Sequence, residues 1–185
     1  MTHADNQAFT RKGWEPLFSC SKTAKIVVIG QAPGIRAQEI NKVWEDKSGE
    51  RLIDWLGITY EELRDDRIVS LLPMDFYYPG KNEKGGDLPP RKGFAEQWHT
   101  PILAEMPDTK LIVLVGKYAQ DHYLSKEVRR KNLTENVYHY RDFLPDFFPI
   151  VHPSPLNFRW LGRNPWFEKQ VVPALRREVK KHLND

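Results

Sequence analysis

Lys25-Ile26-Val27-Val28-Ile29-Gly30 is a short, continuous run of mostly β-branched residues that stops at a glycine. Such a run is typical of a strand that is buried on both faces. Three more apolar runs follow it, at residues 68–72, 110–116 and 147–151. Pro149 lies inside the last run, and proline favours the edge or the start of a strand. The sequence therefore predicts four short strands.

Helical patterns separate these runs. Residues 50–56 place their apolar side chains on one face, and Gly57 is the kind of residue that ends a helix. Further helices are predicted at residues 91–105, 118–124 and 166–183, the last with a kink at Pro173. Strands that alternate with helices predict a mainly parallel sheet covered on both faces. Ligands bind at the carboxyl ends of such strands, which selects the loops at residues 30–49, 73–92, 116–118 and 152–165.

Length and charge narrow the class of protein. The chain has 185 residues, which favours one domain over residues 1–185, with residues 1–22 as a loose arm or a short helix. Lys and Arg total 28 and Asp and Glu total 25, so the net charge is +3. A surface with both signs of charge does not by itself point to a partner.

Cysteine content and hydropathy exclude several kinds of protein. Cys20 is the only cysteine, which excludes an intramolecular disulfide and a metal cluster held by cysteines alone. No run approaches the roughly 20 apolar residues of a membrane helix, and the N-terminus lacks the pattern of a secretory signal. Low cysteine use fits a reducing compartment. We expect a cytoplasmic monomer that needs no metal and no cofactor.

Gly30-Gln31-Ala32-Pro33-Gly34 follows the first predicted strand directly. Two glycines and a proline favour a tight turn, and Gln31 places an amide at the strand tip. The third glycine of a dinucleotide fingerprint and the Gly-Lys-Ser/Thr of a Walker A loop are both missing. The loop is either a plain structural turn or one side of a ligand pocket.

His152-Pro153-Ser154-Pro155-Leu156-Asn157 follows the last strand. The two prolines fix two φ angles and remove two N–H donors, and a rigid loop suits a catalytic histidine. A capped turn with a surface histidine is the alternative. Residues 157–167 then mix cations with aromatics, which suits phosphate and base contacts. We expect Trp166 in the core and Arg159 or Arg163 at the surface.

Together these two loops resemble the first and last motifs of the uracil-DNA glycosylase superfamily. The similarity is closest to the branch whose best-known members carry an iron–sulfur cluster. Residues 42–52 match that branch without a gap, with Trp44 at the place of a Phe, and the match extends to residues 78–81 and 163–167. It covers about residues 25–183 of the chain. The resemblance implies a three-layer α/β/α sandwich around a four-stranded parallel sheet.

The resemblance also implies an activity: extrusion of a damaged base from DNA and hydrolysis of its N-glycosidic bond, as in base excision repair. Trp44 would stack on the base and His152 would donate to its O2. Leu156 would wedge into the vacated stack, and backbone N–H groups near Ser154 would hold a phosphate. Substrate contacts are expected from Gly30, Ala32, Pro33 and Gly34, and further DNA contacts from Lys81, Arg91, Asn157, Arg159 and Arg163.

The sequence departs from the superfamily pattern in three ways. The cysteines of the iron–sulfur cluster are absent. The acid that positions the attacking water is replaced by Gln31 or Ala32, and an amide orients water without acting as its base. The Asn that reads the uracil edge is also missing, because residues 71–74 are Leu-Leu-Pro-Met. Asp75, Tyr77 or a backbone group are the candidates to replace it.

Three functions stay open. The first is a DNA glycosylase that removes uracil or a related deaminated or modified base from duplex or single-stranded DNA. The second is a nucleic-acid-binding protein that keeps the fold but has weak or no catalysis. The third is a small-molecule hydrolase or binder that uses the same pocket. Residues 79–92, rich in glycine and basic side chains, are either a phosphate-tracking loop or a plain surface loop.

Overall fold

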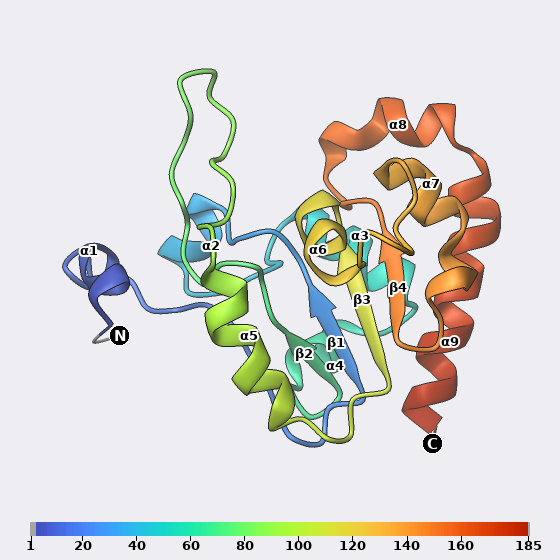
Figure 1. Ribbon diagram of the computed structural model, residues 1–185, viewed down its shortest axis with the longest axis horizontal. Helices are drawn as coiled ribbons and strands as arrows, with labels where there is room; N and C mark the ends of the chain where they lie inside the picture. Colours follow the sequence, from blue (N-terminus) through green and yellow to red (C-terminus); the bar gives the residue numbers. More distant parts are fainter. Residues whose placement is uncertain (1–2, 185) are drawn as a thin grey trace.

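A four-stranded parallel sheet lies at the centre of the molecule (Figure 1). The structure, a computed structural model, describes residues 3–184. Its strands are β1 (Ile26–Ile29), β2 (Val69–Leu71), β3 (Leu111–Val115) and β4 (Phe147–Ile150), in the order β2-β1-β3-β4. In the register, Val28 lies opposite Leu71 and Val113. The predicted strands and their parallel arrangement are confirmed, and Pro149 lies in an edge strand, where its missing N–H is tolerated.

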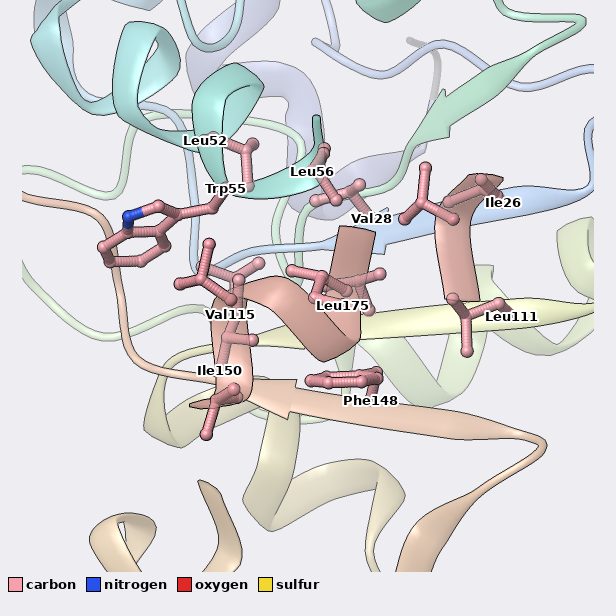
Figure 2. Packing of buried hydrophobic residues seen from close by; sticks show 14 of the residues in the cluster. Ile26, Val28, Leu52, Trp55, Leu56, Leu111, Val115, Phe148, Ile150 and Leu175 are labelled. Atoms are coloured by element: carbon pink, nitrogen blue, oxygen red, sulfur yellow. The ribbon is translucent and has the colours of Figure 1, made fainter. Parts of the chain in front are cut away.

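Helices cover both faces of the sheet because both faces of each strand are apolar. Ile26 and Val28 of β1 belong to one buried cluster, and Val27 and Ile29 belong to another. The first cluster includes side chains of α3 (Lys47–Leu56), α4 (Tyr60–Arg64), α7 (Leu133–Tyr138) and α9 (Val172–Asn184). Figure 2 shows Leu56 of α3 and Leu175 of α9 packed in this cluster. The second cluster includes α5 (Phe94–Ala104) and α6 (Lys117–Tyr123). The fold is therefore the expected three-layer α/β/α sandwich.

The remaining elements are short. They are the 3₁₀ turns η1 (Ala4–Asn6), η2 (Tyr140–Phe143) and η3 (Pro155–Asn157), the helices α1 (Gln7–Thr10), α2 (Ile35–Glu39) and α8 (Phe158–Arg163), and the π-helical turn η4 (Phe167–Val171). Within residues 3–184, no helix has the length and apolar character needed to cross a membrane.

The starts of α3, α5 and α6 differ from the predicted ones by one to three residues, and the C-terminal helix is not regular throughout. α3 starts three residues before Glu50 because the Asp46 side chain accepts hydrogen bonds from Ser48 N and Gly49 N and so caps the helix. The long helix predicted for residues 166–183 is interrupted by the π-helical turn η4 just before Pro173. Proline cannot donate the hydrogen bond that a regular helix would need there, and the wide turn accommodates this loss.

The first segment of the chain packs against the sheet layer. The Phe9 ring stacks on Tyr77 with 4.6 Å between centroids, and Leu17 N donates to Phe76 O over 2.8 Å. The described part of residues 1–22 contains a short helix, α1, whose Phe9 side chain packs against the second buried cluster. Residues 1–2 lie outside the described residues.

Candidate active site

A cavity of about 580 Å³ opens at the carboxyl edge of the sheet. Residues that follow each of the four strands line it: Gly30 after β1, Pro73 after β2, Tyr118 after β3 and His152 after β4. The structure thus brings the two unusual loops of the sequence together. Of the predicted site residues, the cavity is lined by Gly30, Gln31, Ala32, Pro33, Gly34, Trp44, His152, Ser154, Leu156 and Asn157.

His152 carries its proton on the nitrogen that faces away from its own loop. Its Nδ1 accepts a hydrogen bond from Ser154 N over 3.1 Å, so the neutral ring holds its proton on Nε2. Burial lowers the pKa of His152 below its ordinary value, and the negative charge of Asp46 opposes this shift. The ring is therefore neutral at pH 7 and offers an N–H donor in the cavity.

The loop that carries His152 uses its own backbone donors. Leu156 N donates to Ser154 Oγ over 3.2 Å, and Asn157 N donates to Ser154 O over 3.0 Å. Ser154 N is used by His152, and prolines at 153 and 155 have no N–H. Each existing N–H from 153 to 157 has an acceptor within the loop. A phosphate held by backbone N–H groups near Ser154, as predicted, would therefore have to displace one of these bonds. The side chains of the loop remain, including the Ser154 hydroxyl.

Two side chains fix the position of this loop. Asn157 Nδ2 donates to His152 O over 2.8 Å, and Arg51 Nη1 of α3 donates to Pro153 O and Ser154 O, both over 3.3 Å. The loop is rigid on its own and is also attached to α3.

Trp44 forms a second wall of the cavity, adjacent to His152. Its ring lies 5.4 Å from the His152 ring, centroid to centroid, at an interplanar angle of 31°. It also lies against Gly30, where an added Cβ would come within 2.8 Å of the ring atom Cζ2. A glycine at position 30 therefore leaves the space that the indole occupies.

The backbone of Trp44 is strained and is held by distant residues. Its φ is 58°, a left-handed conformation that side-chain-bearing residues rarely adopt. Arg64 of α4 donates to Val43 O over 2.8 Å and to Trp44 O over 3.1 Å. At Gly49 an added Cβ would lie 1.8 Å from Trp44 O. Such strain persists only where its surroundings impose it, and it is concentrated at functional sites.

Carboxylates reach the cavity from a place the sequence did not indicate. Glu45 and Asp46 both line it, but Glu45 is paired with Arg64 over 2.8 Å. Asp46 is solvent-exposed, and its Oδ1 is bound by the first N–H groups of α3. Asp46 was not among the predicted site residues; an Asp that stands just before an apolar helical pattern is the signal for a capping residue at such a loop.

The chain is similar to proteins of one known superfamily. The model of the Uracil DNA glycosylase superfamily matches residues 18–176 of the chain. The chain belongs to this superfamily. The resemblance found in the two loops is thereby confirmed. The superfamily consists in general of N-glycosylases that act on DNA. A solution NMR structure of a “putative Uracil DNA glycosylase” from Methanosarcina acetivorans is similar at 14% sequence identity and a TM-score of 0.48, over 88% of this chain and 98% of that chain.

Some residues predicted for the superfamily site lie elsewhere. Asp75 is fully buried and accepts from Arg91 Nε and Nη2 over 2.7 and 2.8 Å. Arg91 also lies over the Phe9 ring at 4.8 Å. Tyr77 is buried beneath Phe9 and, like Asp75 and Arg91, does not line the cavity. Asp75, Tyr77 and Arg91 thus form a partly buried ion pair and its apolar surroundings outside the cavity, an arrangement that does not fit the predicted base-reading role of Asp75 or Tyr77.

The other predicted cations lie at the surface of this superfamily member. Arg159 and Arg163 of α8 are exposed next to the His152 loop. Lys81 lies in an exposed hairpin, where it pairs with Asp87 in an antiparallel bridge, and Asp87 reaches the cavity. In Figure 1 this hairpin projects from the carboxyl edge of the sheet, above α5. Within the described range, no group of three or more His, Cys, Asp or Glu side chains could hold a metal ion.

Proposed function

We propose that this chain is a DNA glycosylase that extrudes uracil, or a related deaminated or modified base, and hydrolyses its N-glycosidic bond. The observation that carries the proposal is the pairing of the Trp44 ring with a neutral His152 donor, 5.4 Å apart in one cavity of a superfamily member. A base inside a duplex cannot be reached, so the nucleotide must leave the stack before reaction.

His152 would act on the leaving base. As the C1′–N bond breaks, its electron pair moves onto the base, and negative charge develops on a carbonyl oxygen of the ring. The Nε2–H of His152 would donate to that oxygen without transferring its proton. A donor of this kind typically contributes a factor of about 10²–10³ in rate. Trp44 would hold the base by stacking, and the base anion would take up a proton from solvent.

Asp46 and Gln31 would act on the sugar and the water. Loss of the base leaves positive charge on the sugar, as in other glycoside hydrolyses. Three carboxylates line the cavity: Glu45 is paired with Arg64, Asp87 lies in the exposed hairpin, and Asp46 directly follows the Trp44 segment. We assign Asp46 the stabilisation of this charge. Gln31 would orient the water whose oxygen bonds to C1′ and whose proton is released to solvent.

Side chains would hold the DNA backbone, because the backbone donors of the His152 loop are used internally. The candidates are the Ser154 hydroxyl, which lines the cavity, and the exposed cations Arg159, Arg163 and Lys81. Cations that contact phosphates release counterions, so affinity should fall steeply with rising salt. Salt-independent binding would favour a small-molecule ligand instead.

One observation favours a second candidate, a DNA-binding protein without efficient catalysis. The tip of β1 carries Gln31 and Ala32 where superfamily members are expected to carry an acid. If Asp46 does not compensate, binding persists without excision.

The test uses duplex and single-stranded oligonucleotides that contain uracil, hypoxanthine, xanthine or a 5-substituted uracil. Alkali cleaves the strand at any abasic site that the protein produces. We expect cleavage at one or more of these bases with the wild-type protein and much slower cleavage with His152→Ala. Binding with no cleavage at any base would favour the second candidate.

A further inference from the structure

Two highly exposed apolar side chains follow His152 in the chain, and one of them lines the cavity. Leu156 is 86% exposed and Phe158 is 63% exposed, the highest values among the large hydrophobic residues within 3–184. Leu156 lies in η3 and lines the cavity, and Phe158 is the first residue of α8. Exposed apolar side chains next to a binding cavity indicate a contact surface for a ligand.

Leu156 and Phe158 lie two positions apart in the continuous helical segment formed by η3 and α8, so their side chains leave the backbone in different directions. The two side chains therefore cannot both enter one gap in a stack of bases. A duplex with one extruded nucleotide has one vacancy, which a single wedge such as Leu156 fills. A ring face at position 158 can be used fully only if a second base is also unstacked from its neighbours.

We propose that Phe158 is a stacking platform for the base next to the extruded nucleotide, and that single-stranded DNA is accordingly the preferred substrate. This inference rests on the proposed function, because it needs DNA in the cavity. Aromatic side chains that receive successive bases are the usual means by which proteins bind single strands.

The charges around Phe158 complement a DNA strand. The Arg159 guanidinium lies 5.6 Å from the centre of the Phe158 ring, and Arg163 is exposed one helical turn further along α8. Neither arginine has a carboxylate partner among the ion pairs of residues 3–184. Both are therefore available to the phosphates on either side of a stacked base.

The platform is held in place before DNA binds. Trp160 Nε1 donates to Thr134 Oγ1 of α7 over 2.9 Å, and Asn164 Nδ2 donates to Trp160 O over 2.8 Å. The first bond attaches the middle of α8 to α7, and the second closes the C-terminal end of α8. The helix that carries Phe158 is therefore held before DNA binds, so binding a base would need little ordering of the protein.

Binding to matched oligonucleotides tests the proposal. Fluorescence anisotropy would compare single-stranded and duplex DNA of one sequence, each with a stable abasic analogue at the target position. Phe158→Ala should weaken single-strand binding by roughly 5- to 150-fold, the range measured for losing one base–aromatic stack, and duplex binding by less than about twofold. Phe158→Leu, which stays apolar without a π face, should behave like alanine, and Phe158→Trp should bind like the wild type.

Val128→Ala is the control, because Val128 is 53% exposed and does not line the cavity. It should change neither affinity. A 2-aminopurine next to the abasic analogue adds a direct signal: stacking on Phe158 should alter its fluorescence, and Phe158→Ala should abolish that change.

Unchanged single-strand affinity in Phe158→Ala would overturn the stacking role, and equal losses on both DNAs would overturn the strand preference. The assay needs no excision. If the protein excises no base but Phe158→Ala still weakens single-strand binding, the proposed glycosylase reaction is refuted and the stacking role of Phe158 is supported.

Discussion

The two walls of the cavity are held in place by opposite means. The His152 loop is fixed from within, by two prolines and by hydrogen bonds that span two to five residues. The Trp44 wall has a strained backbone that is held from outside by Arg64, some twenty residues away. This backbone also depends on Gly49, because a side chain there would collide with the Trp44 carbonyl oxygen. Local restraints tolerate the loss of a distant contact, whereas an imposed strain is released when the contact that imposes it is removed.

Of the substitutions considered, Gly49→Ala should destabilise the Trp44 wall most strongly. Its Cβ would lie 1.8 Å from the Trp44 carbonyl oxygen, and neither backbone can yield easily. We expect a loss of about 3 kcal/mol in the free energy of unfolding, at the upper end of overpacking effects, measured by urea titration. Gly34→Ala is the matched control, since its new Cβ would meet nothing within 4 Å and its φ is −73°. Equal stability of the two variants would contradict the account of the Trp44 wall.

Removal of an arginine from each wall compares them directly. Arg64→Met deletes bonds of 2.8 and 3.1 Å to carbonyls of a strained segment, and should cost about 2 kcal/mol in the free energy of unfolding. Arg51→Met deletes two bonds of 3.3 Å to a loop that has its own restraints, and should cost under about 1 kcal/mol. The same urea titration measures both. A larger loss for Arg51→Met would reverse the comparison.

A fall in pH should act on the cavity through protonation of His152. The pKa of His152 in the folded protein lies below its ordinary value, so its contribution to stability is present above about pH 6.5 and is lost as the pH falls. Protonation of Nδ1 would also turn the acceptor of Ser154 N into a second donor. We expect excision to decline as the pH falls through the lowered pKa, measured as a pH–rate profile. Asp46→Asn, which can still cap α3, should shift that decline to lower pH; a shift to higher pH would contradict the assigned charge effect.

The smallest expected effect concerns Arg163, an exposed residue of α8 that belongs to neither wall of the cavity. Arg163→Ala should leave the free energy of unfolding within about 0.5 kcal/mol, as for other surface changes. It should reduce by about one the slope of log affinity against log salt concentration for DNA. Anisotropy titrations at several salt concentrations measure this slope. An unchanged slope would remove Arg163 from the DNA contacts.

The sequence predicted the parts of the molecule that depend on local chemistry. The four short apolar runs identified all four strands, and the prolines around Ser154 identified the rigid loop. The Trp44 wall could not be predicted in this way, because the contacts of Arg64 with residues 43 and 44 depend on how α4 packs. Asp75 and Arg91 were misplaced for the same reason: their ion pair is buried by Phe9, which no local pattern connects to them.

The rate of base excision by His152→Ala tests the central claim most directly. With the base that the wild type removes, single-turnover excision should slow by roughly 10²–10³, the loss typical of one such donor. Affinity for the same DNA should change little, because a histidine inside the cavity does not hold phosphate. Gln31→Ala should slow excision by only about tenfold, since an amide orients water without deprotonating it. Excision that persists at the wild-type rate in His152→Ala and disappears in Gln31→Ala would contradict the roles assigned to the two loops.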